Sequence, residues 1–474
     1  MPIIHSSRTT NASRRAFLSA SGLGLVGLTS GQFAKNARAA NAAGSGGKAK
    51  STILIYLNGG PSQIDIWDMK PHAPREYRGD FHPAQTSAPG VTLCEYLPKL
   101  AQQSHHIALV NSLGQHNRAA NDHGAGRYYI MTGHVRDTSL PNQPTPSDWP
   151  YVGSVVTYKK PAHPSLPSSI WLPTKSGPDN VNNPGTFGAR LGVQHDPFYV
   201  LASHENPLEF RSPSLTLEGD ISVSRLQDRR FLLKTLDDAR RGFERSTSIG
   251  NYSQLQQQAF ELLTSQAARV AFDVTRESDD VRRRYGETVN GMSMLMARRL
   301  VEAKVPFITL YWLHNYEEDK KRGCLGGAWD THWKNFSCLK DYLLPLFDQP
   351  FSALLADLHE RGLLDETLVL VTAEMGRTPK IGDPRSGGDG APEPGRDHWT
   401  HCQTALLAGG GIRGGQTYGS SDKIAAYPAD RPVGPEHIAH TVFHAMGIHD
   451  LTAYDNQNRP YNLLDEGQPI TELF

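Results

Sequence analysis

Five short runs of apolar, β-prone residues constrain the fold of this chain more than any other feature. Each run is continuously apolar instead of alternating with polar residues, which is typical of strands that are buried on both faces of a parallel sheet. The runs lie at residues 51–57, 107–110, 305–311, 367–372 and 404–408.

Helical patterns separate several of these predicted strands. Apolar residues recur at spacings of three and four in segments 226–245, 252–274, 292–303 and 351–361. The last two lead directly into predicted strands, and Gly362 is a stop signal for the last of them. Helices that feed buried strands predict an α/β fold with a mostly parallel sheet. In such sheets, functional residues gather in loops beyond the carboxyl ends of the strands.

The composition limits the function. The chain has 48 Lys and Arg against 48 Asp and Glu, so its formal charge is zero. This balance argues against a nucleic-acid binder that works through bulk positive charge. The 44 Gly and 32 Pro in 474 residues indicate many loops. We expect an irregular insertion at 138–222 and a mobile loop at 382–395.

The first 39 residues have the pattern of an export signal. They contain five basic residues and no acid, then an apolar run at 17–28 and a small-residue ending at 37–39. The apolar run is shorter than the about 20 residues of a membrane span, so we expect no stable span. The segment 13–18, Ser-Arg-Arg-Ala-Phe-Leu, resembles the twin-arginine signal. It implies the twin-arginine translocase as a partner and a periplasmic or extracellular location. Residues 40–50 are predicted to be a linker.

Removal of this signal changes the charge and the surroundings of the cysteines. It takes away five basic residues and no acidic ones, which leaves a net charge near −5. An even number of cysteines in an oxidising compartment permits disulfides, although a chain that folds before export cannot depend on them. The candidate pair is Cys324 and Cys338.

The first polar cluster near a predicted strand is Trp-Asp-Thr-His at 329–332. In an extended segment, Asp330 and His332 can turn toward one point, which suits a metal. The alternative is a helix-capping Asp330 with a solvent-exposed His332.

Two further clusters also lie next to predicted strands. Glu374 follows the apolar run at 367–372, and a buried carboxylate must be paired or ligated. The alternative to a ligand role is a structural ion pair between Glu374 and Arg377. The segment 395–399, Gly-Arg-Asp-His-Trp, precedes the strand at 404 and offers His398 as a ligand.

The fourth cluster opens a probable helix at 121–127 and contains Asp122, His123 and Arg127. The backbone N–H groups and dipole of a helix N-terminus attract anions. Arg127 adds a guanidinium fork suited to sulfate or phosphate. The alternative is an ordinary capped helix start.

Four of these segments together resemble the exported domain-of-unknown-function family 1501. They are Ile-Tyr-Leu-Asn-Gly-Gly-Pro-Ser-Gln-Ile-Asp at 55–65, Trp-Asp-Thr-His at 329–332, Ala-Glu-Met-Gly-Arg-Thr-Pro at 373–379 and Gly-Arg-Asp-His-Trp at 395–399. Through that family the chain is similar to the alkaline phosphatase and sulfatase superfamily. The resemblance implies an alkaline-phosphatase-like three-layer sandwich over residues 51–474, with a mostly parallel central sheet.

The superfamily resemblance also implies roles for single residues. Arg127 with Thr132 and Gly133 looks like the Arg-x-x-x-x-Thr-Gly that follows the nucleophile of sulfatases, and His123 stands where sulfatases carry Cys or Ser. Glu374 stands where a metal-binding Asp is expected, and Met375 replaces the neighbour of that Asp.

A second set of residues resembles the other metal site. Asp330 and His332 look like its Asp and His, with shorter spacing, and His398 looks like its last His. Asn58 falls where the first strand normally delivers a metal-binding Asp, and Asp65 is the substitute from further along the loop.

The implied site is therefore a divalent metal centre with an anion-binding rim. The expected metal ligands are Asp65, Asp330, His332, Glu374 and His398. The expected catalytic residues are His123 and Arg127, and the expected supporting or anion-binding residues are Asn58, Asp122, Arg377 and Arg396. Mixed nitrogen and oxygen ligands suit Zn²⁺, Mn²⁺ or iron, with Ca²⁺ less favoured.

The predicted function is metal-dependent hydrolysis of sulfate or phosphate esters, on small molecules or polysaccharides. Because the usual Cys, Ser or Thr nucleophile is missing, two routes stay open: His123 as nucleophile or ligand, or direct attack by a water activated by the metal. The alternative is a catalytically inactive binding or assembly protein on the same scaffold, suggested by the missing nucleophile, Asn58 and Met375.

Overall fold

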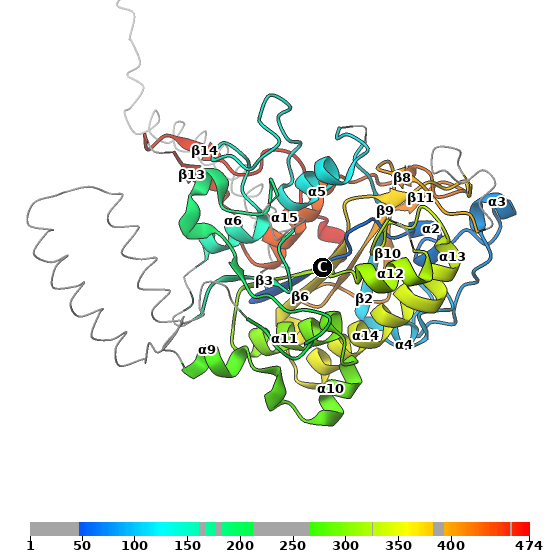
Figure 1. Cartoon of the computed structure of the whole chain (residues 1–474). Helices are drawn as coiled ribbons and strands as arrows, with labels where there is room; N and C mark the ends of the chain where they lie inside the picture. Colours follow the sequence, from blue (N-terminus) through cyan, green and yellow to red (C-terminus); the bar gives the residue numbers. More distant parts are fainter. Residues whose placement is uncertain are drawn as a thin grey trace, which may run out of the picture. The chain divides into compact units, whose positions relative to one another are not determined.

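An eight-stranded sheet lies between two layers of helices in the computed structural model of this chain (Figure 1). The structure describes residues 47–116, 118–160, 163, 166–176, 183–211, 266–324, 326–382, 393–455 and 457–474. The strand order is β10-β2-β9-β6-β1-β5-β3-β4. The strands are β1 (Ser51–Tyr56), β2 (Ile107–Leu113), β3 (Ser169–Leu172), β4 (Phe198–Tyr199), β5 (Phe307–Tyr311), β6 (Thr367–Thr372), β9 (Gln403–Ala408) and β10 (Gln416–Tyr418).

The sheet is mostly parallel, as predicted, and all five predicted strands belong to it. Only β9 among these eight strands runs against its neighbours, since it pairs antiparallel with both β2 and β6. The apolar composition of the strands follows from burial on both faces. In β1, the side chains of Ile53 and Ile55 belong to one hydrophobic cluster, and those of Leu54 and Tyr56 belong to the other.

Each hydrophobic cluster is closed by its own set of helices, which confirms the three-layer arrangement (Figure 1). One face is covered by α4 (Pro98–Gln102), α9 (Gln266–Ala271), α10 (Asp279–Tyr285), α11 (Val289–Glu302) and α14 (Leu344–Glu360). The other face is covered by α5 (His123–Thr132), α6 (Val152–Lys159) and α15 (Pro435–Ala445). Shorter helices lie in the loops: α2 (Gln63–Ile66), α3 (Arg75–Arg78), α12 (Tyr316–Arg322) and α13 (Asn335–Cys338).

The predicted helices at 292–303 and 351–361 correspond to α11 and to the second half of α14. The predicted helix at 226–245 lies outside the described residues. Of the one predicted at 252–274, only the end from residue 266, which contains α9, is described. Three two-stranded sheets complete the strands of the described residues: β7 (Gly376–Arg377) with β8 (His398–Trp399), β11 (Ser420–Ser421) with β12 (Pro428–Asp430), and β13 (Thr452–Tyr454) with β14 (Pro460–Asn462).

The segment 138–222 differs from the irregular insertion that we expected. Its described residues contain α6 and two strands of the central sheet, β3 and β4. The four residues of β3 pair in parallel with β5, and Trp171 is fully buried. Strand β3 has only four residues and lies in a Pro- and Asn-rich segment, so its apolar pattern is too short to predict a strand from the sequence.

The end of the predicted linker at 40–50 is also part of the fold. Gly47 and Ala49 donate backbone hydrogen bonds of 2.9 Å to the carbonyls of His444 and Ala445, at the end of α15. Ala49 is buried. The predicted signal peptide at 1–39 and residues 383–392 of the predicted mobile loop lie outside the described residues.

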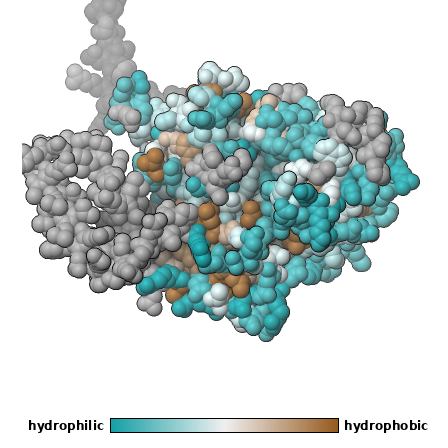
Figure 2. Space-filling view, viewed as in Figure 1, coloured by the Kyte–Doolittle hydropathy of each residue, from teal (hydrophilic) through white to brown (hydrophobic). Residues whose placement is uncertain are grey.

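The described residues contain no helix with the length and apolar character of a membrane span. Hydrophilic residues cover most of the face shown in Figure 2, and apolar residues there form only small groups.

A buried arginine ties together the helices of one layer. The side chain of Arg298 on α11 is 1% exposed and pairs with three carboxylates. Its partners are Glu277 at 2.9 Å, Glu302 at 2.6 Å and Asp357 of α14 at 3.0 Å. The hydroxyl of Tyr285 on α10 also donates to Asp357, at 2.9 Å. The charge of Arg298 therefore compensates buried negative charge from several segments.

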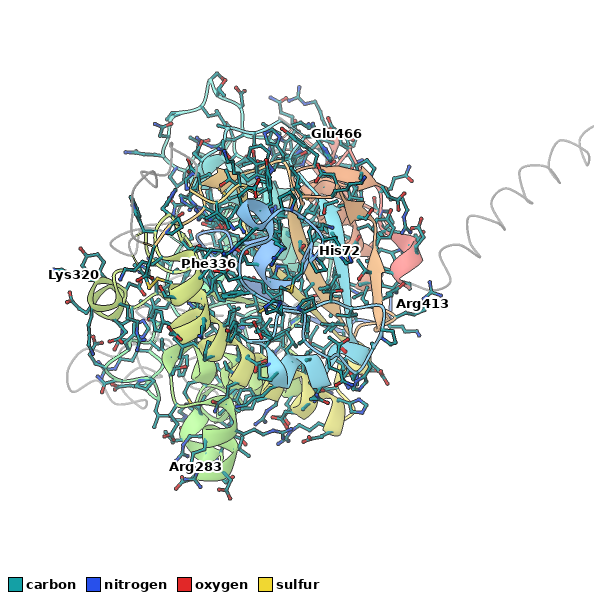
Figure 3. All side chains as sticks on the ribbon, turned by 90° about the vertical axis from the view of Figure 1, so that its right-hand side faces the viewer. His72, Arg283, Lys320, Phe336, Arg413 and Glu466 are labelled. Atoms are coloured by element: carbon teal, nitrogen blue, oxygen red, sulfur yellow. A yellow bond between two sulfur atoms is a disulfide. The ribbon has the colours of Figure 1, made fainter. Side chains whose placement is uncertain are left out.

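We expect Arg298→Ala to lower the free energy of unfolding by about 3–5 kcal/mol, because it leaves buried carboxylates unpaired. Arg283→Ala is the matched control: Arg283 lies at the outer end of α10 and points away from the sheet (Figure 3). Its side chain is 62% exposed and, among the described residues, its one ion pair is with the exposed Asp280, so its loss should cost under about 0.5 kcal/mol. Urea unfolding followed by circular dichroism measures both. Equal midpoints for the two variants would contradict this account of Arg298.

Candidate metal centre

Chain direction brings the predicted polar clusters to one edge of the sheet. Because β1, β2, β5 and β6 are parallel, their carboxyl ends share this edge. Glu374 follows β6, Asp330 and His332 follow β5 through α12, and His123 begins α5 after β2. Strand β9 runs the opposite way, so the residues that precede it, including His398, reach the same edge.

The carboxylate of Asp330 is the centre of the group. Its Oδ1 lies 3.0 Å from Nε2 of His332 and 3.3 Å from Nε2 of His398, and its Oδ2 lies 3.3 Å from Nε2 of His123. A guanidinium nitrogen of Arg377 also contacts Oδ1. Burial by itself raises the pKa of Asp330, but the charge of Arg377 and the hydrogen bonds from the three histidines hold it well below its usual value.

Three of these atoms have the spacing of metal ligands. Nε2 of His332 and Nε2 of His398 are 3.1 Å apart, and both lie within 3.3 Å of Oδ1 of Asp330. Ligands held at zinc–nitrogen or zinc–oxygen distances in a tetrahedron are about 3.3 Å apart. The two imidazoles and the carboxylate therefore fit a divalent transition metal in spacing and in chemistry.

His398 also belongs to two further potential ligand groups. One consists of His123, Asp330 and His398, and the other of His332, Asp397 and His398. Asp397 was not among the predicted ligands, although it belongs to the Gly-Arg-Asp-His-Trp segment. Its Oδ1 lies 3.5 Å from Nδ1 of His332, the ring nitrogen directed away from Asp330. A carboxylate in this place orients a ligating imidazole. The signal in the sequence was its position directly before His398.

His123 bridges two carboxylates. Its Nδ1 lies 2.7 Å from Oε1 of Glu374, and its Nε2 faces Asp330. Burial lowers the pKa of His123, but the hydrogen bonds to Asp330 and Glu374 outweigh it and raise this pKa to about 9. Both ring nitrogens are thus engaged in this arrangement.

Glu374 is buried beneath His123. Its Oε1 also accepts a 2.6 Å hydrogen bond from the backbone N–H of Gly59, and its carbonyl accepts one of 2.5 Å from Gln115. Burial raises the pKa of Glu374, but the hydrogen bond and charge of His123 lower it below its ordinary value. Its Oε2 and Oδ1 of Asn58 are buried without a hydrogen bond of regular geometry. A bound cation or an ordered water would satisfy buried oxygen acceptors of this kind.

Arg377 does not form the structural ion pair with Glu374 that was the alternative to a ligand role for Glu374. Its fully buried guanidinium pairs with Asp330, whereas the partner of Glu374 is His123. Arg377 also donates to the carbonyls of Gly59, Gly60 and Arg396, with 2.8 Å to Gly60 and 3.3 Å to Arg396. It therefore fixes Asp330 to the loops after β1 and before β9.

Asp65 is not part of the cluster, in contrast to our expectation. Both of its oxygens pair with Arg396, at 2.7 and 2.8 Å, and both side chains are fully buried. Ser62 and Asn335 donate to the same carboxylate, at 2.6 and 2.8 Å. A buried arginine needs such a partner, so Asp65 serves as the counter-ion of Arg396 and belongs to no potential ligand group of the described residues, and the buried Arg396 is not open to an anion.

Arg127 and His123 lie on one face of α5, four residues apart. Asp122 caps this helix, since its carboxylate accepts a 2.9 Å hydrogen bond from the N–H of Ala125. Nε of Arg127 is buried without a hydrogen-bond partner. Burial raises the pKa of Tyr311, the last residue of β5, to about 12, and the charge of Arg127 and its hydrogen bond to Tyr311 partly offset this rise.

The predicted disulfide between Cys324 and Cys338 is present in the structure. It joins the end of α12 to α13 and encloses Asp330 and His332 in one covalent ring.

The chain as a whole matches one protein family. The family model described as "Protein of unknown function (DUF1501)" covers residues 49–474. The chain belongs to this family. No curated protein matches it.

Solved structures resemble this DUF1501 chain only distantly. The PsFucS1 sulfatase from Pseudoalteromonas sp. has 12% identity and a TM-score of 0.38, over 84% of this chain and 68% of that one. The phosphonate monoester hydrolase SpPMH from Silicibacter pomeroyi has 13% identity and a TM-score of 0.39, over 89% and 76%. The alkaline phosphatase from the Antarctic bacterium TAB5 has 11% identity and a TM-score of 0.35, over 85% and 99%.

The helix that carries His123 and Arg127 is anchored by a buried carboxylate. The hydroxyl of Tyr129 on α5 donates a 2.6 Å hydrogen bond to Glu436 of α15. Burial raises the pKa of Glu436, but hydrogen bonds from His437 and Tyr129 lower it to about 2. A carboxylate with a depressed pKa stabilises the fold above its unfolded pKa, and this stability is lost as the pH falls toward the folded pKa.

We therefore expect wild type to exceed Glu436→Gln in unfolding free energy by on the order of 2 kcal/mol above pH 5. This difference should shrink between pH 4.5 and pH 2, the window that the pKa shift defines. Urea titrations at a series of pH values measure it. Glu317→Gln, which alters an exposed carboxylate on α12, should follow wild type throughout. A difference for Glu436→Gln that does not change with pH would contradict the ionic role of Glu436.

Proposed function

We propose that this DUF1501 protein is a metal-dependent hydrolase of sulfate or phosphate esters. The observation that carries the proposal is the arrangement of His332, His398 and Asp330, whose three ligand atoms lie 3.0 to 3.3 Å apart at the functional edge of the sheet. Two imidazoles and a carboxylate at this spacing form a donor set for Zn²⁺ or Mn²⁺.

Asp330, His332 and His398 would hold the metal, and Asp397 would orient His332. When bound, a divalent metal polarises the ester group and makes a water molecule more acidic. Arg377 keeps Asp330 in place and supplies a fixed positive charge next to it.

His123 is proposed to move protons. Its bond to Glu374 fixes the orientation of the ring and directs Nε2 toward Asp330. A histidine held by a carboxylate in this way is suited to general acid–base catalysis. Since both ring nitrogens contact carboxylates, the arrangement favours direct attack by water over a covalent intermediate on His123.

Arg127 is proposed to bind the sulfate or phosphate group. It lies one turn along α5 from His123, and its Nε has no partner within the described chain. A guanidinium fork binds two oxygens of such an anion at once.

We further propose export of the folded chain by the twin-arginine translocase to the periplasm or beyond, on the evidence of the signal pattern in residues 1–39. The disulfide supports this location, because such bonds persist in oxidising compartments. Esters on small molecules or polysaccharides are the proposed substrates.

The first test is metal content. Purified protein should retain close to one metal ion per chain, and the loss of a ligand in His332→Ala or Asp330→Asn should weaken metal binding by more than the about 10- to 100-fold that the loss of a residue supporting a ligand costs. His72→Ala is the control, since His72 (labelled in Figure 3) is exposed and belongs to no potential ligand group of the described residues. Elemental analysis and competition with a chelator measure the binding. Wild-type protein that is stable without metal and hydrolyses no ester would refute the proposal.

A catalytically inactive binding or assembly protein is the second candidate. It is favoured by His123 in place of the usual nucleophile and by the buried Met375 after Glu374. Aryl sulfate and aryl phosphate esters tested with several metals separate the two candidates. Turnover that falls by about 100-fold or more in His123→Ala supports the enzyme, within the range expected for a general acid–base residue. Ester binding without turnover in wild type supports the binding protein.

A further inference from the structure

The Cys324–Cys338 disulfide closes a ring of the chain that contains two of the proposed metal ligands. Asp330 and His332 lie near the middle of this ring, between the end of α12 and the start of α13. Cys324 and Cys338 are themselves buried, at 5% and 1% exposure. The remaining cysteines, Cys94 and Cys402, are free.

Two residues of this ring, Ala328 and Lys334, have backbone conformations that their residue types do not favour. Gly326 and Gly327 have positive φ angles of 120° and 84°, and Ala328 and Lys334 have φ of 51° without being glycine. Left-handed conformations at non-glycine residues persist only where the surrounding structure holds them. The segment that carries the ligands therefore depends on constraints from outside.

Noncovalent contacts hold the middle of the ring. The N–H of Trp329 donates to the carbonyl of Asn58 at 3.2 Å, and the buried Trp329 ring packs against Trp312 and Phe347. The N–H of Ala328 donates to Asp319 at 3.3 Å. Between the two ligands, Thr331 donates to Asn335 at 2.6 Å. The ends of the ring are joined by the disulfide.

We propose that Cys324 and Cys338 are the positioning pair of the metal centre, so that metal binding and disulfide formation are coupled. This inference rests on the proposed metal site. With the disulfide formed, Asp330 and His332 are held opposite His398. With the disulfide reduced, the ring gains conformational freedom, and metal binding must order it again.

The redox step is thiol–disulfide exchange. A thiol-based reductant such as glutathione breaks the sulfur–sulfur bond: two glutathione thiols give up two electrons and two protons, which yields two cysteine thiols and one glutathione disulfide. The reverse exchange, with a disulfide as the oxidant, forms the ring. Because coupling between two equilibria is reciprocal, metal must favour the disulfide by the same factor by which the disulfide favours metal.

The test measures both directions of the coupling with Zn²⁺ and the full-length protein. In competition with a chelator, Cys324→Ser/Cys338→Ser should bind Zn²⁺ about ten-fold more weakly than oxidised wild type. Cys94→Ala, which leaves the disulfide intact, should keep the wild-type affinity. In a glutathione redox buffer, saturating free Zn²⁺ should raise the ratio of disulfide to dithiol in wild type by the factor found in the first measurement.

Equal Zn²⁺ affinities in a folded double-serine variant and in wild type would overturn the inference and leave the proposed function standing. If the double-serine variant does not fold, the redox measurement on wild type tests the inference alone. A ratio of disulfide to dithiol that does not change with Zn²⁺ then overturns it. A wild-type protein that binds no Zn²⁺ overturns both this inference and the proposed metal centre.

Discussion

The pairing of Asp330 with Arg377 is the interaction on which the rest of the site depends. Arg377 is fully buried, so its charge must be compensated where it lies, and Asp330 together with three backbone carbonyls provides that compensation. The same contacts join the loop after β1 to the segment before β9. Asp330 is thereby fixed at the point where the side chains of His123, His332 and His398 converge.

A second buried ion pair supports the first from outside the cluster. Arg396 and Asp65 are both inaccessible, and Asn335, which donates to Asp65, also accepts from Thr331 beside His332. This network explains why a carboxylate that follows the first strand does not serve as a metal ligand. The network also distinguishes two arginines that were both predicted from the sequence to serve in anion binding or catalysis. Arg396 is structural, whereas Nε of Arg127 has no hydrogen-bond partner among the described residues.

The metal centre would combine fixed and adjustable parts. Glu374 comes two residues after the end of the fully buried strand β6, and His123 begins a helix that packs on the sheet. Asp330 and His332 lie in an irregular loop whose conformation includes residues with unfavourable φ. The disulfide around this loop gives a covalent constraint to the part of the site that has least secondary structure.

The sequence alone determined the elements whose signal is local. Continuous apolar runs and helical spacing identified all five predicted strands and the helices α11 and α14, because burial on both faces of a sheet leaves a mark in the residues of each strand. The motifs likewise identified Asp330, His332, Glu374 and His398 as residues of the site.

Tertiary structure alone decided which of the charged residues neutralise one another. Asp65 and Asp330 are both acids in segments that follow parallel strands, yet Asp65 pairs with Arg396, whereas Asp330 pairs with Arg377 and the histidines. The tertiary structure also decided that β9 runs antiparallel and that residues 169–172 form a strand. Hydrogen-bond partners in a sheet come from distant parts of the chain and leave no local pattern in the sequence.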